Sequence, residues 1–160
     1  MTEPKLTGKI ARERIVMLDI PRPGKAVIDA YLGLTDLAGT VSDAMDELDR
    51  CLSGGAALLK LLPNCQNVDC SRPAYRPFWE RMAAAGLPLL AHTGGEHTVP
   101  QYRPAYADPA TLQLPLECGV NVIAAHCATK SGWNDPDYLP ALLRMMEHYP
   151  NLYGDISALN

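Results

Sequence analysis

The 160-residue chain is poor in several features, and each shortage argues against a class of protein. No apolar run approaches the roughly 20 residues of a membrane-spanning helix, and the N-terminus, residues 1–5, lacks the apolar core of a signal peptide. No basic stripe accompanies the net charge of −4, which argues against nucleic acid as a partner. We therefore expect a cytoplasmic protein that acts on a small molecule.

Paired cysteines and phosphate-binding loops are also missing. The five cysteines form an odd set without a CxxC pair, which favours free thiols over a disulfide framework. Neither GxGxxG nor GxxxxGK[ST] follows any apolar run, which argues against nucleotide binding.

What the chain does contain is an alternation of short apolar runs and amphipathic segments. The predicted strands are residues 14–20, 56–62, 87–91, 121–127 and 152–155, and the predicted helices are 41–52, 74–85, 108–118 and 138–148. Residues 25–34 are compatible with a short helix or an irregular connection. Such alternation indicates an α/β fold with parallel strands joined by right-handed crossovers, in an open sheet or in a barrel. The long polar segment 93–108 is a candidate substrate loop.

Three of these predicted strands end in a side chain that can bind a metal or move a proton: His92, His126 and Asp155. In a barrel, successive strand ends face a common pocket, so the three side chains could converge. Imidazole and carboxylate suit zinc, manganese or iron(II), and a catalytic metal activates water at neutral pH. Lys60 is an oddity within an apolar strand. Two interpretations stay open for it, a head group in solvent or paired with Asp155, and a charge that points into the pocket.

Four segments carry a resemblance to a known family. The runs LLKLLPN, RPAYRPFWERMAAAGLPLLAHTG, GVNVIAAHCA and HYPNLYGDISALN resemble the amidohydrolase superfamily of metal-dependent TIM-barrel hydrolases, over about residues 55–160. They are most similar to the branch that includes aminocarboxymuconate-semialdehyde-type decarboxylases. The resemblance implies that His92 is a metal ligand and that His126 is a second ligand or the catalytic acid/base. It places Asp155 on the seventh barrel strand, near the site, and implies a divalent metal, zinc before manganese or iron.

The sequence also departs from this family. The HxH pair of the first barrel strand is absent, and no eighth-strand aspartate follows Asp155. Five predicted strands against eight indicate an incomplete (β/α) TIM-type barrel, with residues 1–160 as a single partial domain and a fragment of a longer protein. The edges of such a sheet would be exposed, so we expect a homo-oligomer.

The predicted function is metal-dependent hydrolysis of an amide, lactone or related carbonyl, with His126 and Asp155 as catalytic residues and Lys60 and Arg103 as substrate-binding residues. One alternative is non-oxidative decarboxylation, for which a pocket arginine facing a carboxylate would be the mark, with Arg103 as the candidate. Another is a non-catalytic barrel remnant, and a third is a flavodoxin-like open sheet with a small-ligand site.

Overall fold

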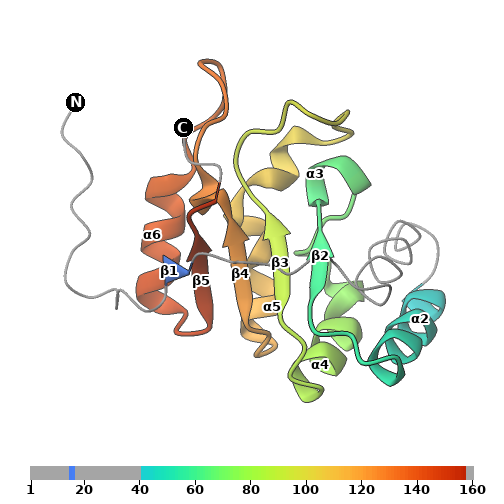
Figure 1. Cartoon of the computed structure of the whole chain (residues 1–160). Coiled ribbons are helices and arrows are strands. Elements are labelled where there is room, and N and C mark those ends of the chain that lie inside the picture. Colours follow the sequence, from blue (N-terminus) through green and yellow to red (C-terminus); the bar gives the residue numbers. More distant parts are fainter. Residues whose placement is uncertain (1–14, 17–40, 158–160) are drawn as a thin grey trace.

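A five-stranded parallel sheet forms the centre of the computed structural model, which describes residues 15–16 and 41–157 (Figure 1). The strands are β1 (Ile15–Val16), β2 (Leu59–Leu61), β3 (Leu89–His92), β4 (Val122–Ala125) and β5 (Leu152–Asp155). Their order is β1-β5-β4-β3-β2, so β1 pairs with β5 while the other four strands follow the chain order. All pairs are parallel, which confirms the predicted strand–helix alternation.

The helices lie close to their predicted ranges. They are α2 (Val41–Ser53), α3 (Pro63–Gln66), α4 (Arg76–Ala84), α5 (Gln113–Glu117) and α6 (Leu139–His148), with 3-10 turns η3 (Pro73–Tyr75), η4 (Pro104–Ala107), η5 (Pro109–Leu112) and η6 (His126–Ala128). None of the helices in the described ranges is long and apolar enough to cross a membrane. The predicted strand 14–20 is described only at Ile15 and Val16, and the segment 25–34 lies outside the described residues.

A local prediction needs correction, because the predicted strand 56–62 is shorter in the structure and β2 is limited to Leu59–Leu61. Pro63 then begins the single turn α3. Proline suits the first turn of a helix, and the Gln66 side chain accepts the backbone N–H of Leu62 at 2.7 Å, which closes that turn.

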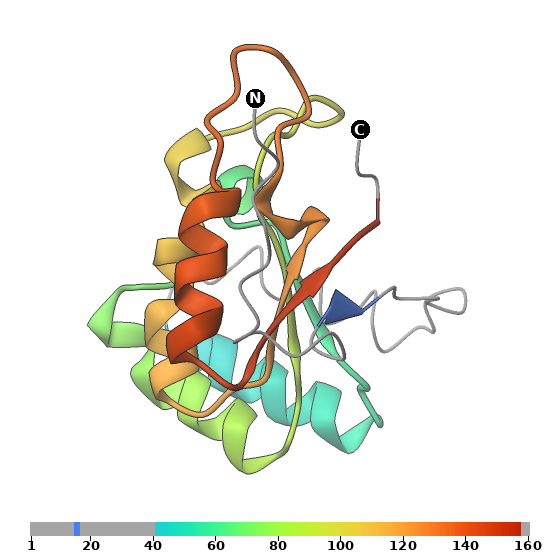
Figure 2. The ribbon, with the colours of Figure 1, turned by 90° about the vertical axis from the view of Figure 1, so that its left-hand side faces the viewer.

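One face of the sheet is covered by helices, as the side view in Figure 2 shows. Successive side chains of a strand point to opposite faces, and the residues that point to this face are at most 2% exposed: Leu59, Leu61, Leu89, Ala91, Val122, Ala124 and Leu152. They form one apolar cluster with Leu48 of α2, Trp79 of α4 and Met146 of α6. This cluster is the core of the described domain.

The opposite face has a different composition. The register aligns Lys60 with Leu90, Leu90 with Ile123 and Ile123 with Tyr153, so these side chains share that face. The same alternation assigns His92 and Asp155, at the carboxyl ends of β3 and β5, to this face. The charged and polar strand residues Lys60, His92 and Asp155 therefore lie on the face that the described helices leave uncovered.

Candidate functional site

A pocket of about 520 Å³ opens beyond the carboxyl ends of β3 and β4. In parallel α/β folds this end of the sheet is where ligands bind. The lining residues come from the ends of the two strands and from the loops that follow them: His92, Gly95, Glu96, His97, Thr98, His126, Ser131 and Gly132. The pocket therefore contains both histidines that the sequence singled out, together with part of the predicted substrate loop.

His92 is the last residue of β3 and is only 4% exposed. Burial lowers the pKa of its imidazole to about 4, and the positive charges of Lys60 and His126 act in the same direction. Its Nδ1 lies 3.9 Å from a carboxylate oxygen of Glu96, and its buried Nε2 has no hydrogen-bond partner. At neutral pH this ring is uncharged, and a buried nitrogen without a partner is the kind of atom that a bound ligand or metal satisfies.

His126 does not extend the strand as predicted, because β4 ends at Ala125. His126, Cys127 and Ala128 have φ values of 61°, 48° and 55°, so the chain makes a left-handed turn built from residues with side chains. Each such residue costs about 1–2 kcal/mol relative to a right-handed conformation. Strain of this kind persists only where surrounding contacts determine it, and it is common at functional sites.

The turn brings the two imidazoles together. The ring centroids of His92 and His126 are 5.3 Å apart, with an edge-on angle of 63° between the ring planes. The Nδ1 of His126 lies 2.9 Å from the carbonyl oxygen of Ser157. A carbonyl only accepts, so Nδ1 carries a proton, and in the neutral form of the ring the lone pair lies on Nε2. A carbonyl in this position orients a histidine as the outer partners of metal ligands do.

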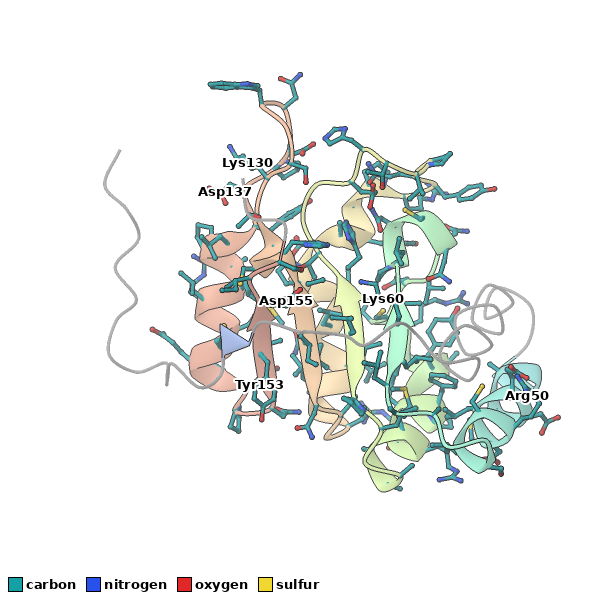
Figure 3. All side chains as sticks on the ribbon, viewed as in Figure 1. Arg50, Lys60, Lys130, Asp137, Tyr153 and Asp155 are labelled. Atoms are coloured by element: carbon teal, nitrogen blue, oxygen red, sulfur yellow. The ribbon has the colours of Figure 1, made fainter. Side chains whose placement is uncertain are left out.

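Asp155 and Lys60 are not among the residues that line the pocket. Asp155 is 3% exposed, and its carboxylate accepts hydrogen bonds from the backbone N–H and the hydroxyl of Ser157. Burial lowers the pKa of Lys60 to about 8, while the negative charges of Asp155 and Glu96 oppose that shift. Figure 3 shows Lys60 on β2 and Asp155 on β5, with β3 and β4 between them.

A second acidic side chain, Glu96, lines the pocket from the loop after β3. One of its carboxylate oxygens accepts the backbone N–H and the hydroxyl of Thr98, and these bonds lower its pKa despite the opposing effect of burial. The other oxygen is the one that faces His92. The only sequence signal for Glu96 is its position four residues after a strand-end histidine.

A link that no sequence pattern predicts joins the two loops that border the pocket. Nε2 of His97 lies 2.9 Å from Oδ2 of Asp135, and the same oxygen accepts the backbone N–H groups of Ser131 and Gly132. These bonds lower the pKa of Asp135, with the His97 bond as the largest cause. A side chain at Gly95 would collide with this carboxylate, so the close approach of the loops requires glycine there.

The structure does not bring Arg103 to the pocket. Its side chain is exposed, it does not belong to the lining residues, and its backbone N–H binds the carbonyl of Asn64 at 3.0 Å. The pocket therefore gathers His92 and His126 at its wall, while Lys60, Asp155 and Arg103 are not among its lining residues.

The donor set fits part of a metal centre. Two imidazoles with ring centroids 5.3 Å apart, one with an unpartnered Nε2 and one with its Nδ1 held by a carbonyl, match the nitrogen ligands of zinc, manganese or iron. Within residues 15–16 and 41–157 there is no group of three or more His, Cys, Asp or Glu side chains arranged to hold an ion. The described part of the chain thus offers two imidazoles and not a full set of metal ligands.

Three comparisons relate this geometry to known proteins. The model of a family described as amidohydrolase (Amidohydro_2) matches residues 25–160. A crystal structure of an uncharacterized TIM-barrel protein from Bordetella bronchiseptica is similar with a TM-score of 0.57 and 20% sequence identity, over 74% of this chain and 40% of that chain. A search of curated proteins found no match. The likeness confirms the predicted α/β fold as an incomplete TIM barrel, since the chain spans 40% of the matched structure's length.

Proposed function

The chain belongs to the amidohydrolase family, and from that premise we propose that it carries part of the active site of a metal-dependent hydrolase. The reaction is the attack of water on an amide, lactone or related carbonyl. The observation that supports this most is the pair of imidazoles at the pocket wall, with the buried Nε2 of His92 left without a partner next to His126.

In this proposal His92 and His126 hold a divalent metal through their Nε2 atoms, with zinc first and manganese or iron as alternatives. When bound, such a metal supplies a Lewis acid that activates water at neutral pH. Two protein ligands are fewer than the three of a typical catalytic zinc site. A further ligand would therefore come from outside the described residues.

The chain's own residues prepare the site in three ways. Burial keeps His92 uncharged, so that a lone pair is available at neutral pH. The carbonyl of Ser157 fixes the tautomer of His126. Burial lowers the pKa of Lys60 to about 8, so this side chain can hold or release a proton close to neutral pH. In this proposal Asp155 orients Ser157, which in turn contacts the ring of His126.

The alternative reaction is non-oxidative decarboxylation, and the lining residues favour hydrolysis over it. A carboxylate substrate is usually matched by an arginine or lysine. No described lining residue is an arginine or a lysine, and Glu96 places a negative charge at the wall. A neutral carbonyl substrate suits this pocket better than a carboxylate does.

The test is an assay of the zinc-loaded chain against matched amides, lactones and carboxylic acids. We expect hydrolysis of amides or lactones, lowered about 100-fold or more in His126→Gln, because this variant loses a proposed ligand of the metal that activates water. His148→Gln is the matched control, because that histidine lies exposed at the end of α6 and binds the carbonyl of Arg144. Release of carbon dioxide without hydrolysis would contradict the proposal, and so would equal loss in the two variants.

A further inference from the structure

Thr93 follows His92 directly and is 1% exposed. Its hydroxyl donates to the carbonyl of Ala125 at 2.7 Å and accepts the backbone N–H of Ala128 at 3.1 Å. These two groups are the last residue of β4 and the last residue of the left-handed turn. One side chain directly after β3 therefore binds both ends of the turn that contains His126.

The turn needs such bonds because its three residues have side chains and positive φ values. The backbone N–H of Ala128 and the carbonyl of Ala125 are buried, and buried backbone groups of this kind require partners. Within the turn, the carbonyl of His126 accepts from both the N–H and the hydroxyl of Thr129 at 3.0 and 2.8 Å. Thr129 thus closes the turn, and Thr93 ties it to the neighbouring strand.

Two glycines allow this close packing. A side chain at Gly94 would collide with the backbone of Thr129, and Gly94 also has a φ of 86° that favours glycine. A Cβ at Gly154 would lie 2.9 Å from the sulfur of Cys127, closer than such atoms approach. The turn is therefore fixed from β3 on one side and from β5 on the other.

We propose that Thr93 is a positioning residue of the site: its hydroxyl couples the end of β3 to the left-handed turn after β4, and so sets the distance between the His92 and His126 rings. The hydrogen bonds of the Thr93 hydroxyl go to the backbone of Ala125 and Ala128 and not to either imidazole ring. Its effect on the rings therefore acts through the backbone. This inference deepens the proposed function, because it concerns the placement of the two proposed metal ligands.

The test compares Thr93→Val, which keeps the shape and removes the hydroxyl, with Thr93→Ser, which keeps the hydroxyl. The first measurement is the nuclear Overhauser effect between the ring protons of His92 and His126 in the metal-free chain. We expect it in the wild type and in Thr93→Ser, and we expect its loss in Thr93→Val. Thr111→Val is the matched control, because the Thr111 hydroxyl also binds a backbone carbonyl, that of Asp108, away from the site.

The second measurement is zinc binding by calorimetry. Loss of a group that orients metal ligands typically weakens binding about 10- to 100-fold, and we expect this in Thr93→Val but not in Thr93→Ser or Thr111→Val. A wild type that shows the ring contact but binds no zinc would contradict the proposed function. The role of Thr93 would then be decided by the ring contact alone, compared between Thr93→Val and Thr93→Ser.

The role of Thr93 would be overturned if Thr93→Val kept both the ring contact and the wild-type zinc affinity. It would also be overturned if Thr93→Ser lost the contact, since the hydroxyl is still present. Thr93→Ala is made in parallel, because it removes the hydroxyl without placing a second methyl group beside the N–H of Ala128. If neither Thr93→Val nor Thr93→Ala folds, the residue supports the fold as a whole and the proposal is wrong.

Discussion

The two faces of the sheet differ in composition although they belong to the same strands. On the helix-covered face, every strand residue from β2 to β5 is apolar or glycine and buried. On the other face, the same strands carry Lys60, His92 and Asp155. Alternation along each strand thus separates the residues that stabilise the domain from those that form the site. The difference predicts that substitutions on the helix-covered face lower stability more than substitutions on the other face do.

The largest effect is expected on the helix-covered face, at Trp79. This side chain is fully buried, packs edge-on against Phe78 and donates its indole N–H to the carbonyl of Cys70 at 3.2 Å. Trp79→Ala should lower the free energy of unfolding by about 3–5 kcal/mol, measured by urea denaturation.

Trp133→Ala is the control for that experiment, because Trp133 is completely exposed. Its free energy of unfolding should stay within about 0.5 kcal/mol of the wild-type value. Equal changes in the two tryptophan variants would mean that the core is not where the structure places it.

On the opposite face, His92 should make stability depend on pH. Burial lowers its folded-state pKa to about 4, whereas the unfolded-state value is about 6.5. Between these values the unfolded chain binds a proton that the folded chain does not, so stability decreases as the pH falls from about 6.5 to about 4. The full loss is about 3 kcal/mol.

The measurement is urea denaturation of the metal-free chain at several pH values in this window, beside His92→Asn. The variant should show a smaller decrease, since it lacks the titrating group. If the unfolding free energies of the two proteins changed with pH in the same way, His92 would not be buried in its neutral form. That result would contradict the difference between the two faces of the sheet.

A smaller and more local effect is expected at the link between the loops. Asp135→Ala removes the acceptor of the Ser131, Gly132 and His97 bonds. We expect faster hydrogen exchange at the backbone amides of Ser131 and Gly132, and a loss of about 1–3 kcal/mol of unfolding free energy. Asp137→Ala is the control, because that carboxylate has a single, longer bond to the N–H of Leu139 at 3.3 Å. Unchanged exchange in Asp135→Ala would contradict the link.

The smallest effect is expected at Arg103, which directly precedes η4 and belongs to no strand of the sheet. Because its side chain is exposed and outside the lining residues, Arg103→Ala should leave the KM of any hydrolysed substrate within about twofold of the wild-type value. A larger rise in KM would restore the predicted substrate contact and extend the site beyond the described pocket.

The sequence was sufficient to predict the features that repeat along the chain. Apolar runs and amphipathic segments predicted the strand–helix alternation. The strand-end positions of His92, His126 and Asp155 predicted that the three side chains converge, and the pocket lining contains the two histidines but not Asp155. The left-handed turn at His126 was not predictable, because it depends on Thr93 and Gly154 from neighbouring strands rather than on local propensity.

The same reason applies to the bond between His97 and Asp135, which are 38 residues apart in the chain. A loop histidine and a loop aspartate have no periodic pattern that would connect them, and only the packing of two loops brings them together. Arg103 shows the converse limit, since charge type alone suggested a role that its position in the fold does not support.

The central claim is that His92 and His126 form one metal-binding pair. The most direct measurement is zinc content by elemental mass spectrometry after loading and buffer exchange, for the wild type, His92→Ala, His126→Ala and the control His148→Ala. We expect near-stoichiometric zinc in the wild type and in the control, and its loss in both site variants. Zinc that persists in His126→Ala, or is absent from the wild type, would contradict the claim.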